Sequence, residues 1–188
     1  MFHALCFMTT MDNFEIKFVK YLNQIGSKKI DKFLGVVNAV SFLAFFWIFL
    51  TVVAIVTHPI ITEKFIVAVI IVVVLHFTIT EGIIKHFLIR FYPMRRRPYV
   101  AYPEMIKSVG RKFSDSSFPS SHMATTAAML VVIVSFYPSL LIFSLLLILL
   151  MAFSRLHNGM HYPSDVIAGI FLGFVYGYAA LRIAEMVL

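Results

Sequence analysis

Long uncharged apolar runs alternate with shorter polar segments along most of the chain. The runs cover residues 36–56, 65–89, 124–136, 140–153 and 166–188. About 20 residues of α-helix cross a hydrocarbon core of roughly 30 Å. The third and fourth runs are shorter, so we expect their helices to extend into flanking residues such as Ser121 and His122. The pattern predicts an all-α, polytopic membrane helix bundle with about five transmembrane helices.

The first polar segment has a different pattern. Phe14, Phe18 and Leu22 recur at helical spacing between lysines in residues 12–32. Such a segment is too polar to span a bilayer and is typical of an amphipathic helix lying on the membrane surface. We therefore expect one membrane-embedded domain over residues 1–188, with an interfacial helix at 12–32 and a transmembrane bundle at 36–188.

Composition and charge support membrane lipids as the chain's surroundings. Hydrophobic residues make up 61% of the chain and charged residues 13%, against about 45–50% and 25% in soluble domains. The net charge of +7 comes mainly from basic residues beside apolar runs, where they usually meet lipid headgroups. We expect no nucleic-acid partner and infer no obligate protein partner. The single cysteine, Cys6, cannot form an internal disulfide.

Five spans place the distinctive polar residues on one membrane face. The loop after the second span, the start of the third, the end of the fourth and the start of the fifth all meet there. Polar clusters occur at 90–98, 118–122 and 154–165. The sequence thus predicts a catalytic face formed by residues 90–122 and 154–165. Within the last span Gly169, Gly173 and Gly177 lie four residues apart and permit close helix packing.

The cluster at 118–122 contains a helix start. Pro119 and Ser120 suit the first positions of a helix, whose free N–H groups bind phosphate readily. His122 would lie in the first turn, where it could protonate a departing oxygen. Taken alone, such a string is more often a capped helix with a polar surface histidine.

The cluster at 154–165 gives the stronger chemical signal. A carboxylate such as Asp165 can fix the tautomer of His161 and leave its other nitrogen as a nucleophile. The planar guanidinium of Arg155 matches phosphate oxygens. The alternative is simple polarity between two spans, but Arg, His and Asp together are costly beside lipid. The cluster therefore favours a phosphate site.

The three clusters together resemble the type 2 phosphatidic acid phosphatase family, the integral-membrane relatives of vanadium haloperoxidases. That family carries Lys-x6-Arg-Pro, Pro-Ser-Gly-His and Ser-Arg-x5-His-x3-Asp in this order. Here the first motif reads Arg90-x6-Arg97-Pro98, with Arg in place of Lys. The second has Ser121 in place of Gly, and the third matches throughout.

The resemblance implies a lipid phosphatase with a phosphohistidine intermediate and no metal or other cofactor. By analogy His161 attacks phosphorus, Asp165 orients it and His122 protonates the leaving lipid oxygen. The phosphoryl oxygens would be held by Arg90, Arg97, Arg155, Ser120 and the Ser121 backbone N–H. Because Arg90 replaces a lysine, Lys85 is the alternative cation for the first motif, although it could also pair with Glu81 four residues before it.

Three other functions are compatible with parts of the pattern. His157 and His161 are four residues apart and could begin a metal site, but Gly159 and Pro163 disfavour a continuous helix there. A small membrane transporter is the alternative of another class, yet transporters place their polar groups near mid-membrane. An inactive scaffold would usually lack a catalytic His or Asp, and none is missing.

Location and substrate rest on the resemblance. The positive-inside rule would place the basic loop in the cytoplasm, whereas the family keeps its site on the extracytoplasmic face of the inner membrane. We follow the family. Arg95 and Arg96, beyond the motif's needs, suggest a headgroup with several anionic groups and favour a lipid A 1-phosphatase. Undecaprenyl-diphosphate phosphatase and phosphatidylglycerol phosphate or phosphatidic acid phosphatase are the alternatives.

Overall fold

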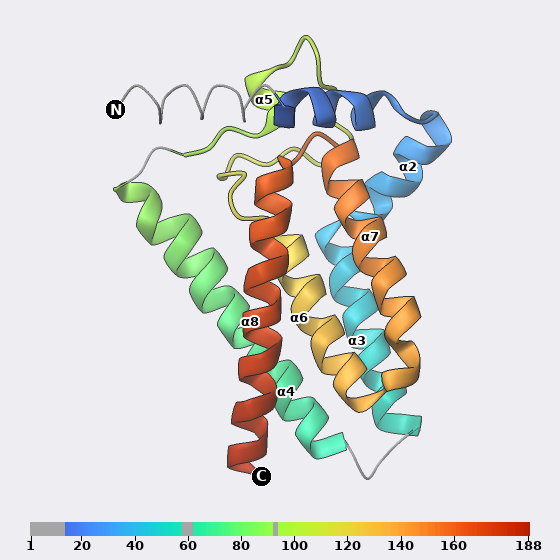
Figure 1. Ribbon diagram of the computed structural model, residues 1–188, viewed down its shortest axis with the longest axis vertical. Helices are drawn as coiled ribbons and strands as arrows, with labels where there is room; N and C mark the ends of the chain where they lie inside the picture. Colours follow the sequence, from blue (N-terminus) through green and yellow to red (C-terminus); the bar gives the residue numbers. More distant parts are fainter. Residues whose placement is uncertain (1–13, 58–61, 92–93) are drawn as a thin grey trace.

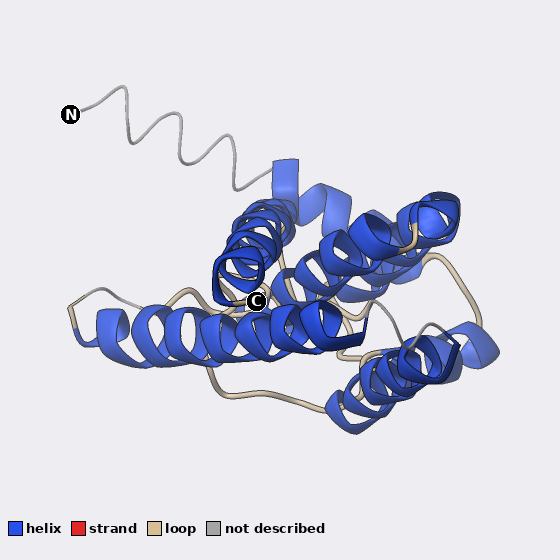
Figure 2. Ribbon diagram, turned by 90° about the horizontal axis from the view of Figure 1, so that it is seen from below, coloured by secondary structure: helices blue, strands red, loops and turns tan. Residues whose placement is uncertain are grey.

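The computed structural model is a bundle of upright helices with its long polar connections gathered at one end (Figure 1). It describes residues 14–57, 62–91 and 94–188, and the described residues contain no strand (Figure 2). Four helices are long and apolar enough to cross a membrane. These are α3 (Val40–Thr57), α4 (Thr62–Leu75) continued by η1 (His76–Phe87), α7 (Leu141–His157) with the short turn before it, and α8 (Pro163–Val187).

A fifth apolar helix, α6 (Ser121–Phe136), occupies the middle of the bundle. It begins at Ser121, so the predicted extension of this short run is confirmed. Its 16 residues give a length of about 24 Å at about 1.5 Å per residue, less than a full crossing. In Figure 1 it starts lower in the bundle than the end of α7 and the start of α8. The polar residues at its start are therefore drawn into the bundle.

Small residues hold α6 against α8, its most extensive helix partner. Gly169, Gly173 and Gly177 face α6, and a Cβ on Gly173 would lie 2.5 Å from the carbonyl oxygen of Ala124. Only a residue without a side chain fits at that distance. The close packing predicted from the glycine spacing is thus present, and it fixes the starts of α6 and α8 side by side.

The predicted interfacial helix at 12–32 is two helices in the structure, and residues 12 and 13 lie outside the described part. Residues 14–24 form the first helix and α2 (Lys28–Val37) the second. They are separated at Gly26, whose φ of +128° is reached readily only by glycine. Residues 14–24 lie across the end of the bundle, while α2 slopes into it (Figure 1). The helical spacing of apolar residues continues across Gly26 in the sequence, so it did not predict this break.

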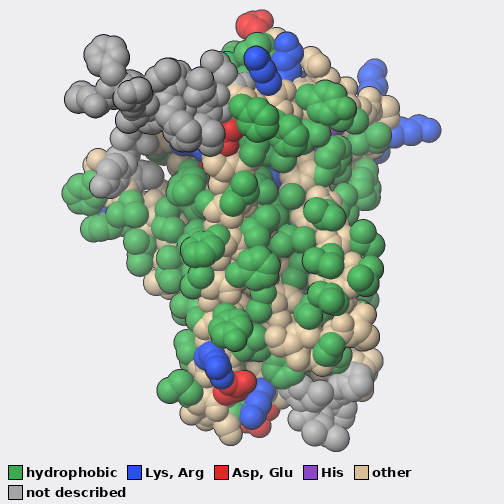
Figure 3. Space-filling view, in the orientation of Figure 1, with side chains coloured by type: hydrophobic (Ala, Val, Ile, Leu, Met, Phe, Trp, Pro, Cys, Tyr) green, Lys and Arg blue, Asp and Glu red, His purple; other side chains and the backbone are tan. Residues whose placement is uncertain are grey.

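Charged side chains gather at the two ends of the molecule, with an apolar belt between them (Figure 3). The belt exposes large side chains such as Phe45, Phe77, Leu146 and Phe171. An apolar surface of this extent is typical of a protein that faces lipid. The short helix α5 (Pro98–Ala101) and the loop after it belong to the polar end.

Candidate active site

The three motif clusters meet at the polar end of the bundle. Arg97 lies just before α5, His122 lies in the first turn of α6, and Arg155 lies near the end of α7. His161 is in the connection to α8, and Asp165 is in the first turn of that helix. All five side chains are buried. The fold therefore brings together residues that are up to 68 positions apart in the sequence, from 97 to 165.

His161 points one ring nitrogen at backbone and the other at cations. Its Nδ1 lies 2.7 Å from the carbonyl oxygen of Ser117, which can only accept, so Nδ1 carries the proton. Its Nε2 lies 2.8 Å from Nη2 of Arg155 and 3.3 Å from Nη1 of Arg97. The free electron pair on Nε2 is thus directed into a cluster of guanidinium groups.

The environment keeps His161 neutral. Burial lowers the pKa of His161 well below its usual value, and the positive charges of Arg155, Arg97 and Lys85 lower it further. A neutral imidazole has the electron pair that a nucleophile needs. The surroundings therefore favour the neutral form of this histidine.

Asp165 lies near His161, in the first turn of α8. Its Oδ2 accepts the backbone N–H of Tyr162 at 2.9 Å and lies 3.6 Å from Nδ1 of His161. The bond from the Tyr162 N–H to Asp165 is one of the two reciprocal hydrogen bonds of a capping box at the start of α8. Pro163 is the first helical residue there. The direct hydrogen bond of His161 goes to Ser117, while Asp165 acts on the ring from a longer distance.

Asp115 joins two cations of the cluster. Its Oδ2 lies 2.7 Å from Nζ of Lys85, and its Oδ1 lies 2.7 Å from Nη2 of Arg97. Burial alone would raise the pKa of Asp115, but the bonds to Lys85 and Arg97 outweigh burial and lower it to about 2. The carboxylate is therefore ionised at neutral pH and holds both cations in place.

The structure places Lys85, and not Arg90, in this cluster. Lys85 is on η1, a stretch of π-helix, and its side chain is 4% exposed. Its Nζ also lies 3.8 Å from Glu81, the predicted partner, which is farther than Asp115. Arg90 ends the next turn, η2 (Leu88–Arg90), and is exposed. π-Helical turns inside α-helices often occur at functional sites.

His122 and Arg155 share a partner outside the motifs. The carbonyl oxygen of Asn38 lies 3.0 Å from Nε2 of His122, so Nε2 carries the proton and Nδ1 is the ring nitrogen open to proton exchange. The Oδ1 of Asn38 accepts from Nη1 of Arg155 at 2.6 Å. Asn38, at the turn between α2 and α3, therefore orients both side chains.

The two serines of the second motif differ in their contacts. Ser120 precedes α6; its backbone N–H donates to the carbonyl of Asp165 at 3.1 Å. Its hydroxyl is buried without a hydrogen-bond partner in the described structure. The Ser121 hydroxyl donates to Glu81, which leaves the backbone N–H of Ser121 as its contribution to the helix start.

His157 contacts residues of the two N-terminal helices. Its Nδ1 lies 2.9 Å from the Leu22 carbonyl and its Nε2 lies 2.9 Å from Asp31. It thereby ties the N-terminal helices to α7. Among the described residues no group of three or more His, Cys, Asp or Glu side chains is placed to hold a metal ion.

Arg95 corrects an interpretation based on the sequence. Rather than offering a free charge to a headgroup, its guanidinium binds Asp165 at 2.7 Å and Glu15 at 2.6 Å. Sequence reasoning missed Glu15, Asn38 and Asp115 as members of the site. No local motif marks them, because each acquires its partner only through the fold. Of the two arginines, Arg96 alone remains exposed.

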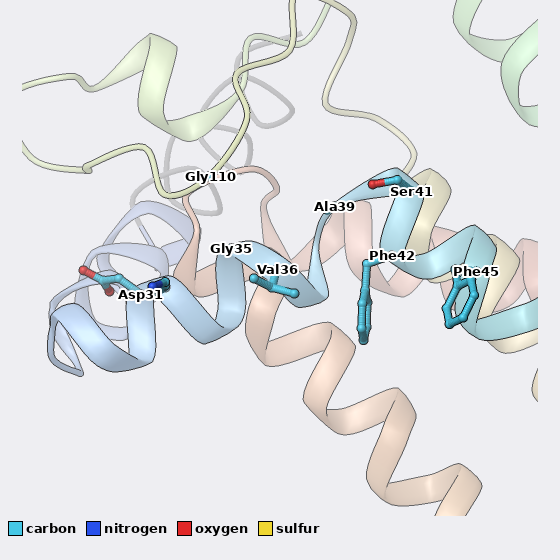
Figure 4. Close-up of a pocket in the computed structure, with 9 residues that line it drawn as sticks. Asp31, Gly35, Val36, Ala39, Ser41, Phe42, Phe45 and Gly110 are labelled. Atoms are coloured by element: carbon cyan, nitrogen blue, oxygen red, sulfur yellow. The ribbon is translucent and has the colours of Figure 1, made fainter. Parts of the chain in front are cut away.

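An open groove of about 630 Å³ lies where α2 turns into α3 (Figure 4). Val36, Phe42 and Phe45 give it apolar walls, and Asp31 and Lys32 lie at its polar side. Ala39, another lining residue, follows Asn38 in the chain.

The sequence profile of the PAP2 superfamily matches residues 64–187, which include every motif residue of the cluster. The chain belongs to the PAP2 superfamily. The undecaprenyl-diphosphatase BcrC of Bacillus subtilis is 30% identical over 111 residues, which are 56% of this chain and 53% of that protein. The match therefore spans about half the length of this relative.

Solved structures show the PAP2 fold at low sequence identity. The PAP2-type phosphatidylglycerolphosphate phosphatase of Bacillus subtilis has a TM-score of 0.66 and 18% identity, over 95% of this chain and 88% of that one. LpxE of Aquifex aeolicus has a TM-score of 0.61 and 20% identity, over 88% and 93%. The expected fold class is confirmed by these PAP2 structures and by the helices themselves.

Proposed function

We propose that this chain removes a phosphate or pyrophosphate group from a lipid headgroup through a phosphohistidine intermediate, without a metal. The observation that carries the proposal is the Nε2 of His161, which faces Arg155 at 2.8 Å and Arg97 at 3.3 Å. A neutral nucleophile directed at two fixed cations is suited to attack on a phosphoryl group.

The first step forms a bond between Nε2 of His161 and phosphorus as the bond from phosphorus to the lipid oxygen breaks. The positive charge that develops on the ring is balanced by Asp165, 3.6 Å from Nδ1. His122 enters this step protonated on both ring nitrogens. Its Nδ1 proton passes to the leaving oxygen while the Nε2–H stays on the Asn38 carbonyl, so the ring is left neutral. In the second step His122 takes a proton from water, the water oxygen bonds to phosphorus, and inorganic phosphate leaves His161.

Lys85, Arg97 and Arg155 neutralise the phosphoryl oxygens in this proposal. Lys85 takes the role assigned to Arg90 by the motif spacing, because it is buried and ion-paired with Asp115 at the cluster. The Ser120 hydroxyl and the Ser121 backbone N–H add neutral donors. Phosphoryl transfer depends almost entirely on such positioning and charge neutralisation.

For the substrate we favour a polyprenyl diphosphate, the class of undecaprenyl diphosphate. The support is the 30% identity with an undecaprenyl-diphosphatase. The argument for lipid A is weaker, since Arg95 is engaged by Asp165 and Glu15. The site is proposed to face the extracytoplasmic side of the inner membrane.

The test is phosphate release by the full chain in detergent, with EDTA present, from undecaprenyl diphosphate, lipid A, phosphatidylglycerol phosphate and phosphatidic acid. Wild type is compared with His161→Ala and with His86→Ala, an exposed histidine that serves as the matched control. We expect release that survives EDTA, is lost in His161→Ala and persists in His86→Ala.

Each other result has a definite meaning. Loss of activity in EDTA that Mg²⁺ or Zn²⁺ restores would replace the mechanism with a metal-dependent one. Fastest release from lipid A would restore the lipid A 1-phosphatase assignment. No release from any of the four lipids would overturn the phosphatase proposal and favour a transporter.

A further inference from the structure

A second group of charges lies behind the catalytic pair. Arg95 donates from Nη1 to Oδ1 of Asp165 at 2.7 Å and from Nη2 to Oε2 of Glu15 at 2.6 Å. Glu15 belongs to the helix of residues 14–24, which lies across the end of the bundle. One guanidinium therefore connects the N-terminal helix to the carboxylate that faces His161.

The same two residues hold the first turn of α8. Oε1 of Glu15 accepts the backbone N–H of Ser164 at 2.8 Å, and Arg95 donates to the Ser164 hydroxyl at 2.6 Å. The Arg95 guanidinium also lies 4.1 Å from the centre of the Tyr162 ring. Arg95 thus holds Oδ1 of Asp165, whereas Oδ2 is the oxygen nearer His161, so these contacts control where the carboxylate can lie.

The two carboxylates that Arg95 binds are buried and need a cation nearby. Asp165 is fully buried and Glu15 is 5% exposed. A buried carboxylate is costly unless it is paired and hydrogen-bonded, and here one arginine fork pairs with both. Loss of Arg95 would leave two buried carboxylates without a cation. Loss of Glu15 would release one arm of Arg95 and the bond to Ser164.

We propose that Arg95 and Glu15 are positioning residues for the His161–Asp165 pair, so that the N-terminal helix is part of the catalytic apparatus. This inference rests on the proposed function and extends it to residues outside the three motifs. Neither residue is proposed to touch the substrate. Both act through Asp165.

The effect on proton binding follows from the charges that face the pair. His161 is near Arg155 of α7, Lys85 of η1, His122 of α6 and Arg97. Asp165 is paired with Arg95. Removing Arg95 leaves the Asp165 charge uncompensated 3.6 Å from Nδ1 of His161, which favours the protonated ring and raises its pKa.

The experiment measures kcat, KM and the pH dependence of kcat/KM with the lipid of the four that wild type hydrolyses fastest. The variants are Arg95→Gln, Arg95→Lys, Glu15→Gln and the double Glu15→Gln/Arg95→Gln, with Arg96→Gln as the matched control. We expect Arg95→Gln to lower kcat about 10²-fold with little change in KM. The acid limb of its profile moves to higher pH.

The other variants separate positioning from simple structural support. Glu15→Gln lowers kcat by less than Arg95→Gln, and because it removes a negative charge it does not move the acid limb to higher pH. The double variant is no worse than Arg95→Gln, because Glu15 acts through Arg95. Arg95→Lys keeps the charge, so its acid limb stays near that of wild type even if part of kcat is lost. Arg96→Gln behaves as wild type.

A kinetic profile of Arg95→Gln that matches Arg96→Gln would overturn the inference. So would a raised KM at unchanged kcat, since that result assigns Arg95 to headgroup binding. If Arg95→Gln does not fold, Glu15→Gln and Arg95→Lys decide by kcat, and a wild-type kcat in both overturns the inference.

A readout without substrate separates this inference from the proposed function. The pKa of His161 is measured by NMR in protein labelled with ¹³C-histidine and assigned with His161→Ala. We expect it to be higher in Arg95→Gln than in wild type, Glu15→Gln and Arg96→Gln. An inactive wild type with this pattern would remove the phosphatase proposal alone. An active wild type without it would remove the positioning proposal.

Discussion

Lys85 and Arg90 are both basic, five positions apart, and yet have opposite surroundings. Lys85 is 4% exposed and ion-paired at 2.7 Å with Asp115, which in turn binds Arg97. Arg90 is exposed at the end of η2. A cation contributes to phosphoryl transfer only where it reaches the developing charge. Burial and pairing therefore favour Lys85, although motif spacing favours Arg90.

We expect Lys85→Ala to reduce kcat about 10²–10³-fold, the usual cost of removing one donor from a transition state. Arg90→Ala should stay within about threefold of wild type, because an exposed side chain away from the cluster adds little. Both are measured by phosphate release from the same lipid in detergent. Equal losses in both variants, or a larger loss in Arg90→Ala, would return the role to Arg90.

At the scale of elements, the contact of α6 with α8 sets the geometry of the site. His122 lies in the first turn of α6 and Asp165 in the first turn of α8, and the backbone of Ser120 bonds directly to the Asp165 carbonyl. The approach is as close as glycine permits, since a Cβ on Gly173 would lie 2.5 Å from the Ala124 carbonyl and from the Ala127 Cβ. The close packing of α6 on α8 thus determines how His122 and Asp165 are placed relative to each other.

Gly173→Ala should lower the free energy of unfolding by about 1–3 kcal/mol, as expected for an overpacked core. The helices must separate to admit the methyl group, so activity should fall too. Val175→Ile is the control, because it adds one methylene to an exposed position of the same helix. Thermal unfolding in detergent measures both. A Gly173→Ala variant as stable as the control would contradict the tight contact.

At the scale of the whole molecule, the site and the C-terminus lie at opposite ends. The polar loop and residues 14–24 share one end, and α8 finishes at the other (Figure 1). The basic loop would favour a cytoplasmic site by the positive-inside rule. In the structure, however, Arg95, Arg97 and Lys107 of this region are paired with carboxylates. These basic residues therefore have structural partners, and the extracytoplasmic side of the site stays a prediction.

Cysteine labelling measures the sidedness. In a Cys6→Ser background, we expect Lys112→Cys to react with a membrane-impermeant maleimide from the extracytoplasmic side. Glu185→Cys, at the other end, should react only after the membrane is permeabilised. Both positions are exposed, so each label reports its compartment. The reverse pattern would place the site in the cytoplasm.

The helical membrane fold, the family and the order of the three clusters can be predicted from the amino-acid sequence without coordinates. Apolar run length and motif spacing are properties of the linear chain, so they survive without coordinates. The single interfacial helix was the main error in the fold, because apolar spacing continues across Gly26 and only the backbone angle there reveals the break.

The pairing of the buried charges depends on how the helices pack and could not be predicted from the sequence. Asp115 pairs with Lys85, which lies 30 positions earlier in the chain. Arg95 pairs with Glu15, 80 positions earlier, and with Asp165, 70 positions later. Asn38 reaches Arg155 across 117. Such pairs form because burial makes an unpaired charge costly, and the partner that relieves the cost is whichever one the packing of helices brings near. No local pattern in the chain encodes that choice.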